Sequence, residues 1–132
     1  MHIKFKTNAK LATEDIIRVF DSSGIRRPTS EPVRIRQMFD ESNLVISAWD
    51  GVELIGLARS LTDFCYCCYL SDLAVKKEFQ KAGIGKTLIE LTQQNIGDNC
   101  MLLLLSAPEA MEYYPKIGFE KTENGFIIKR KK

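Results

Sequence analysis

Residues 75–87 read Val75-Lys-Lys-Glu-Phe-Gln80-Lys-Ala-Gly83-Ile-Gly85-Lys-Thr87, and this stretch decides the fold. The residues before it, 69–75, have the alternating apolar pattern of a strand, whereas residues 87–96 place apolar side chains along one side of a helix. The first backbone N–H groups of a helix have no internal acceptor and carry the positive end of its dipole, so a phosphate binds there without a cationic side chain. Gly83 and Gly85 let that phosphate come close because neither has a Cβ.

Several types of phosphate-binding loop contain such glycines, and the spacing of the glycines distinguishes one type from another. A Walker loop would need its first glycine where this chain has Gln80, which disfavours a nucleotide-hydrolysing enzyme. A dinucleotide-binding loop would need a third glycine where this chain has Leu88. The remaining pattern, Gln-x-x-Gly-x-Gly, resembles the pyrophosphate loop of the GCN5-related N-acetyltransferase (GNAT) family, although the glycines alone are also compatible with a simple tight turn. The resemblance assigns acetyl-CoA binding to Gln80, Lys81, Ala82, Gly83, Ile84, Gly85, Lys86 and Thr87.

A second motif lies downstream, after the apolar run at residues 101–107. It resembles the late signature of the same family, an alanine-containing helix that ends in Tyr-x-Lys-x-Gly-Phe. The matching residues are Ala110, Tyr114, Lys116, Gly118 and Phe119. The two motifs have the family's order and a plausible separation, and the earlier strands fit the same plan, so the resemblance covers most of the chain.

The remaining segments predict the rest of the fold. Helices are expected at 13–20, 33–39, 87–96 and 108–116. Strands are expected at 3–7, 44–49, 54–61, from about 65 to 75, at 101–107, and in a late hairpin of 119–122 with 126–129 around Asn124-Gly125. Early antiparallel strands followed by alternating strands and helices imply an α/β (mixed α+β) fold. Its central mixed, largely antiparallel sheet would have helices on both faces, as in the acyl-CoA N-acyltransferase (GNAT) fold. A length of 132 residues fits one domain, residues 1–132.

Composition disfavours several other classes. A formal charge of +2 is too small to indicate a nucleic-acid partner, and the basic end Lys129–Lys132 has the character of a solvated tail. No apolar run approaches the length of a membrane span, and the N-terminus lacks the apolar core of a signal peptide, so we expect no membrane partner and a cytoplasmic location.

The cysteines do not indicate a metal site. Cys65, Cys67, Cys68 and Cys100 lack the two spaced pairs of a zinc motif, and the single histidine is His2. They have the character of small apolar residues in a reducing compartment, and we expect no metal.

The resemblance also implies an activity. It predicts transfer of the acetyl group of acetyl-CoA to a primary amine of a small molecule or peptide, by direct attack in a ternary complex. Backbone groups of Leu73, Ala74 and Val75 would run beside the pantetheine arm and polarise the thioester. Tyr114 would protonate the departing thiolate, with a packing role as the alternative. Lys81 and Lys86 would have secondary roles near the phosphates.

The general base is not specified. Some family members use a carboxylate at the position of Tyr69, which is not an effective base, so Asp72 acting through a water is the candidate, with unassisted ordered water as the alternative. The acceptor amine is not specified either. A non-catalytic acetyl-CoA sensor or interaction module is the competing functional class, and the chain is expected to be a monomer or a homodimer.

Overall fold

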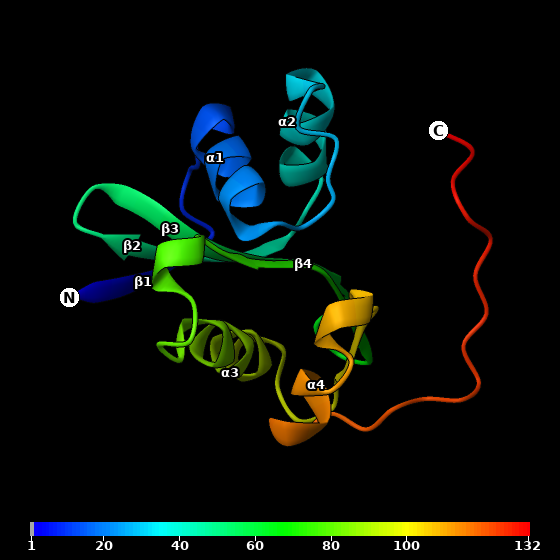
Figure 1. Ribbon diagram of the computed structural model, residues 1–132. Helices are drawn as coiled ribbons and strands as arrows, with labels where there is room; N and C mark the ends of the chain where they lie inside the picture. The colour runs from blue at the N-terminus through cyan, green and yellow to red at the C-terminus, as the bar shows by residue number, and fades with distance from the viewer. Residues whose placement is uncertain (1) are drawn as a thin grey trace.

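The computed structural model describes residues 2–132 and contains one five-stranded sheet between two layers of helices (Figure 1). The elements are β1 (Ile3–Thr7), α1 (Thr13–Ser23), α2 (Pro32–Asp40), β2 (Leu44–Asp50), β3 (Glu53–Thr62), β4 (Cys67–Val75), the 3₁₀ turn η1 (Lys77–Phe79), α3 (Ile84–Ile96), β5 (Met101–Leu104), the 3₁₀ turn η2 (Pro108–Ala110) and α4 (Tyr113–Lys116). The strands lie in the order β1-β2-β3-β4-β5, and every neighbouring pair is antiparallel except β4 with β5. This confirms the predicted fold class.

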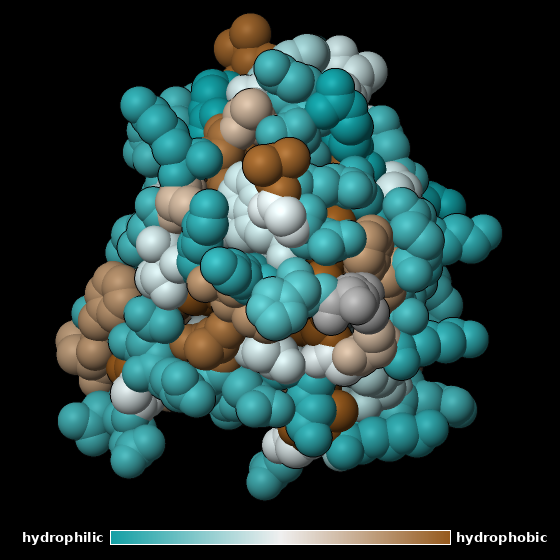
Figure 2. Space-filling view, turned by 90° about the vertical axis from the view of Figure 1, so that its left-hand side faces the viewer, coloured by the Kyte–Doolittle hydropathy of each residue, from teal (hydrophilic) through white to brown (hydrophobic). Residues whose placement is uncertain are grey.

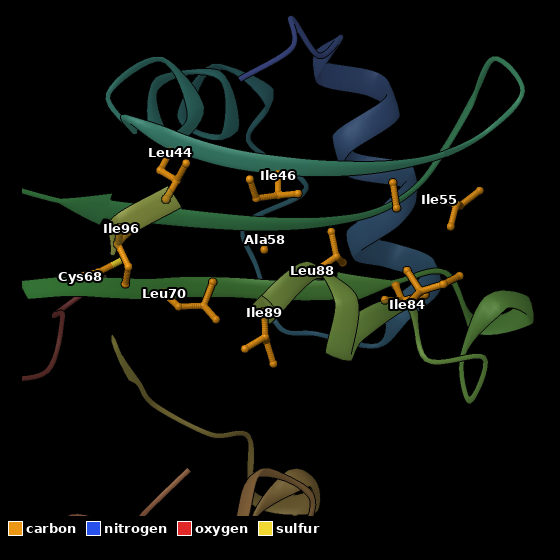
Figure 3. Packing of buried hydrophobic residues seen from close by; sticks show 12 residues of the cluster. Leu44, Ile46, Ile55, Ala58, Cys68, Leu70, Ile84, Leu88, Ile89 and Ile96 are labelled. Atoms are coloured by element: carbon orange, nitrogen blue, oxygen red, sulfur yellow. The ribbon is translucent and has the colours of Figure 1, made fainter. Parts of the chain in front are cut away.

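Each face of the sheet has its own apolar core. On one face α3 packs against β2, β3 and β4 through Leu88, Ile84 and Ile89 (Figure 3). On the other face α1 and α2 pack through Phe20 and Ile35, which are fully buried. Helices cover both faces of β3, so its residues 54–60 are all buried. A strand buried on both faces requires a near-continuous run of apolar residues, as this one has.

Gly56 on β3 lies where the backbone of β4 and the side chain of Leu88 on α3 come close. A Cβ at this position would lie 3.3 Å from the carbonyl oxygen of Ala74 and 3.5 Å from Leu88 Cδ1. The Ala74 carbonyl would have to give by a few tenths of an ångström, whereas the contact with Leu88 would be an ordinary van der Waals one, so glycine mainly relieves crowding between β3 and β4.

The late hairpin predicted from residues 119–122 and 126–129 is wrong for this chain taken alone. Phe119 packs beside the α3 core, but the residues after it form no strand, and Phe126 and Ile128 are fully exposed. A two-stranded hairpin needs an apolar surface to pack on, and residues 120–131 extend away from the sheet (Figure 1). The end of this segment meets α2, where Arg34 donates to the Lys132 carbonyl oxygen at 3.4 Å. Smaller differences concern helix boundaries: α3 begins at Ile84 rather than Thr87, and 108–116 divides into η2 and α4. Among residues 2–132, no helix is both long and apolar enough to cross a membrane.

Candidate functional site

The last part of β4 has no strand on the side of β5. Pairing between the two parallel strands stops at Leu70 with Leu104, whereas β4 continues to Val75. We call residues 71–75 the free edge of β4. Side chains along it are used by the two cores, because Leu73 and Val75 pack on the α3 side and Ala74 on the α1 side. The groups that this edge can offer to a ligand are therefore those of its backbone.

The free edge leads directly to the glycine loop. Gly83 precedes the first turn of α3 with φ at 80°, a left-handed conformation that favours glycine, and no side chain caps the helix. The amides at the start of α3, those of Ile84, Gly85 and Lys86, have no intrahelical acceptor. Free amides together with the helix dipole make this turn chemically suited to an anion.

Side chains of the loop hold its shape. The Gln80 side-chain amide donates to the Val75 carbonyl oxygen at 2.9 Å, which ties the loop to the end of β4. The Thr87 hydroxyl donates to the Gly83 carbonyl at 3.1 Å. Lys81, Ala82 and Lys86 are exposed, so the two lysines are available to a ligand phosphate. Figure 2 shows this end of the molecule, covered mainly by hydrophilic side chains with apolar ones showing through in separate places.

Two adjacent tyrosines at α4 face different surroundings. Tyr114 packs against the α3 core and meets Phe119 edge-to-face with ring centroids 5.4 Å apart. Burial raises the pKa of Tyr114, with a smaller contribution from Tyr113, so its phenol stays protonated at neutral pH. The Tyr113 hydroxyl instead lies over the start of α3, 3.7 Å from where a Cβ on Gly85 would be.

Sequence reasoning assigned Tyr113 to packing and missed its position beside the loop. Neighbouring residues on a helix point about 100° apart, so one tyrosine of the pair had to leave the core. Helical periodicity alone does not determine which of the two does so.

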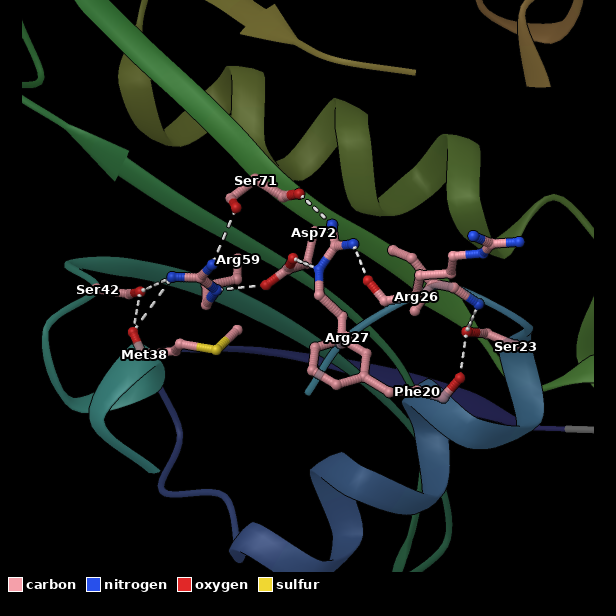
Figure 4. Close-up of polar contacts among 10 residues, drawn as sticks. Phe20, Ser23, Arg26, Arg27, Met38, Ser42, Arg59, Ser71 and Asp72 are labelled. Carbon is pink, nitrogen blue, oxygen red and sulfur yellow. Dashed lines mark hydrogen bonds and ion pairs between the residues drawn. The ribbon is translucent and has the colours of Figure 1, made fainter. Parts of the chain in front are cut away.

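Asp72 is buried in a cluster of ion pairs (Figure 4). One carboxylate oxygen accepts from Arg27 Nε, on the loop between α1 and α2, and the other accepts from Arg59 Nε on β3. Arg59 also donates to the Ser42 hydroxyl at 3.0 Å, and Arg27 to the carbonyl oxygen of Ser71 at 2.8 Å. We call Arg27, Arg59 and Asp72 the arginine–aspartate cluster. It joins the loop before α2 to β3 and β4.

Asp72 is a predicted site residue, whereas neither arginine is. Arg59 could have been recognised, because it is a charged residue inside the apolar run of β3 and a buried guanidinium requires an acidic partner. Arg27 lies in a loop and is 45 residues from Asp72, so nothing local indicates their contact. Tyr69, the position at which the resemblance predicts a carboxylate base in some relatives, lies on the opposite face of the sheet from α3 and is 37% exposed.

The cysteines lie around the start of β4 and β5, away from the loop. All four are free thiols, and no group of three potential metal ligands occurs among residues 2–132. Burial raises the pKa of Cys68, and the neighbouring Asp63 carboxylate is the main cause that raises the pKa of Cys67. Cys67 and Cys68 are therefore mainly protonated at neutral pH and are poor nucleophiles.

Known proteins share this architecture. The sequence matches the GNAT acetyltransferase domain family over residues 13–129. The uncharacterised N-acetyltransferase ycf52 of Pyropia yezoensis is 24% identical over 130 residues, covering 93% of this chain and 73% of the relative. A probable acetyltransferase of Staphylococcus aureus superposes with a TM-score of 0.82 at 22% identity, covering 98% of this chain and 100% of the other.

An enzyme solved with the cosubstrate product has the same fold. The aminoglycoside N-acetyltransferase AAC(6′)-Iy, solved in complex with CoA, superposes with a TM-score of 0.73 at 18% identity, covering 98% of this chain and 95% of the other. The structural likenesses show the fold, and the family match covers most of the sequence. This chain belongs to the GNAT acetyltransferase family.

Proposed function

We propose that this protein transfers the acetyl group of acetyl-CoA to a primary amine of a small molecule or peptide, by direct attack in a ternary complex. The observation that carries the proposal is the continuity of the free edge of β4 with the open first turn of α3. One end offers backbone groups to a pantetheine arm and the other offers amides to a pyrophosphate.

Each residue of the site has a proposed task. Amides from Gly83 to Lys86 would bind the pyrophosphate, and Gln80 would fix the loop that presents them. Backbone groups of Leu73, Ala74 and Val75 would orient the thioester and stabilise the developing oxyanion. Acetyl-CoA supplies the activated acetyl group, and the Tyr114 phenol would donate its proton to the leaving sulfur.

Tyr113 would have a different task from Tyr114. Its hydroxyl lies over the turn that would bind phosphate, so it would donate a hydrogen bond to the bound cosubstrate rather than take part in proton transfer. The two tyrosines thereby separate binding from catalysis in a way that kinetics can test.

Deprotonation of the amine has no obvious side-chain base. Asp72 was proposed to act through a water, but both its oxygens accept from arginines and it is buried. These surroundings favour a positioning role for Asp72 and proton loss from the amine to ordered water. The same observation keeps the sensor alternative open, because a sensor needs no base.

The test is acceptor-dependent loss of the acetyl-CoA thioester across a panel of amines, amino acids and peptides. Thioester absorbance or chromatography is preferable to thiol reagents, because the protein has four free cysteines of its own. Wild type, Tyr114→Phe and Tyr113→Phe are compared under the same conditions. The proposal is supported if turnover falls in Tyr114→Phe and the KM for acetyl-CoA rises only in Tyr113→Phe.

Calorimetric titration with acetyl-CoA separates the alternatives. Binding without turnover for any acceptor favours the sensor. Failure to bind acetyl-CoA at all contradicts both functions.

A further inference from the structure

The arginine–aspartate cluster contains more positive than negative charge. Two guanidinium groups, those of Arg27 and Arg59, share the single carboxylate of Asp72. The acids at the two ends of α2 are already paired with arginines of that helix. Because arginine does not lose its charge in proteins, the three side chains together have a net charge of +1. A partly buried positive charge of this kind favours a bound anion.

Arg27 is the member of the cluster that a ligand can reach. Its side chain is 25% exposed, compared with 9% for Arg59 and none for Asp72. A guanidinium has five N–H groups. Arg27 uses one for Asp72 and one for the carbonyl oxygen of Ser71, at 2.8 Å. A third donates to the Arg26 carbonyl oxygen at 2.6 Å. Within residues 2–132, two N–H groups of Arg27 are therefore left for a ligand.

Arg27 also lies beside the place proposed for acetyl transfer. Its guanidinium reaches β4 next to Ser71 and Asp72, and the exposed residue Arg26 precedes it on the same loop (Figure 4). Ser71 is the first residue of the free edge of β4, and Leu73, whose backbone would orient the thioester, follows about 7 Å along the strand. A positive charge at this point repels a cationic group of the acceptor and attracts an anionic one.

On the basis of the proposed function, we propose that the acceptor is an amine that also has a carboxylate, as an amino acid does, and that Arg27 binds this carboxylate. The two remaining N–H groups of Arg27 suit such an acceptor, because a guanidinium forms its strongest hydrogen bonds with carboxylates. In an α-amino acid the amine lies about 2.5 Å from the carboxylate carbon. A carboxylate held by Arg27 therefore leaves the amine within reach of a thioester beside Leu73. The same charge disfavours acceptors with several positive charges, such as polyamines and aminoglycosides.

The test compares acceptors that differ only in the carboxylate. Each amino acid of a panel is assayed with acetyl-CoA beside its amide and its decarboxylated amine, and thioester loss gives kcat/KM. The free acid should have a kcat/KM higher by about 10- to 100-fold, the contribution of hydrogen bonds between charged groups. Conversion to the amide removes a negative charge and so lowers the pKa of the amine. A site indifferent to the carboxylate would therefore prefer the amide.

Variants assign the preference to Arg27. Arg27→Gln should reduce the ratio of kcat/KM between acid and amide by about tenfold or more. It leaves Asp72 paired with Arg59, so we expect it to fold, and circular dichroism checks this. Arg27→Lys keeps the charge but not the planar fork and should retain part of the ratio. Arg18→Gln is the matched control, because Arg18 is 63% exposed and pairs with Asp15 on the surface of α1. It should leave the ratio unchanged.

The outcomes separate this inference from the proposed function. Transfer to amides or polyamines that equals or exceeds transfer to the free acids overturns the inference alone, and this wild-type comparison does not depend on the folding of any variant. A preference for the acid that persists unchanged in folded Arg27→Gln overturns the assignment to Arg27. Transfer to no amine at all overturns the inference together with the proposed function.

Discussion

Replacement of Asp72 by asparagine tests whether this residue is a base or a structural anion. The Asp72 side chain has no exposed surface, and its partners Arg59 and Arg27 are 9% and 25% exposed. Neutralising one member of a buried ion pair leaves the other charge uncompensated, which costs about 3–5 kcal/mol. The new amide also turns an N–H toward an arginine that can only donate. We expect the free energy of unfolding to fall by that amount, with Tm lower by about 10–20 °C.

The assay is urea unfolding followed by circular dichroism and by the fluorescence of Trp49. Asp40→Asn is the matched control, since Asp40 pairs with Arg36 at 3.0 Å on the surface of α2, with side chains 61% and 36% exposed. An exposed pair of this spacing contributes about 0.3–0.5 kcal/mol. If both variants lose the same small amount, the arginine–aspartate cluster does not stabilise the fold as we describe.

The test is completed by enzyme kinetics, measured at a temperature at which the Asp72→Asn variant is folded. A positioning role predicts an unchanged pH dependence of kcat, with an altered KM for the acceptor because the loop before α2 is no longer held through Arg27. Loss of the acidic limb of the profile would instead establish Asp72 as the base.

Three further predictions concern the loop, the acid and the thiols. Gly85→Ala should leave the free energy of unfolding equal or raise it by up to about 1 kcal/mol. The same variant should raise the KM for acetyl-CoA at least tenfold. Gly83→Ala should lower the free energy of unfolding by about 1–2 kcal/mol, because φ at Gly83 is positive. Tyr114→Phe should lower kcat by about 100-fold. Since burial raises the pKa of Tyr114, the wild-type alkaline limb should lie above the ordinary pKa of 10.0, and it should vanish in the variant. Asp63→Asn should lower the pKa of Cys67 and speed its alkylation by iodoacetamide at pH 8, as measured by mass spectrometry, because the Asp63 charge is the main cause of the raised pKa.

The parts of the fold that sequence predicted are those with local causes. The strand, glycine loop and helix around residues 69–96 follow from alternation, missing side chains and helical periodicity, all within one short stretch. The β2–β3 hairpin follows from the Asp50-Gly51 turn between two apolar runs. Gln80 was selected as part of this loop, but its bond to Val75, which holds the loop in place, depends on the folded path of the turn.

Contacts between segments that are distant in the sequence cannot be predicted from local patterns. Arg27 and Asp72 are brought together only when α1 and the loop after it settle on β4, so neither residue's neighbours indicate the pair. Tyr113 and Tyr114 show that a local pattern can also fail for two adjacent residues. Their order along the chain is fixed, but the direction from which α4 meets the core decides which of them packs and which lies over Gly85.

The C-terminal segment, residues 120–132, separates local preference from the structure that forms. Asn124-Gly125 followed by Phe126–Lys129 has the pattern of a turn and a strand, and this describes what the segment favours wherever an edge is available. β5 equally favours a second neighbour, because its apolar residues continue to Leu105 without a charge. In the structure residues 120–132 form no strand, and Phe126 and Ile128 are fully exposed, so neither preference is satisfied. Whether the segment reaches the edge of β5 depends on the path of residues 120–125 after Phe119, and an alternating pattern of side chains does not encode that path.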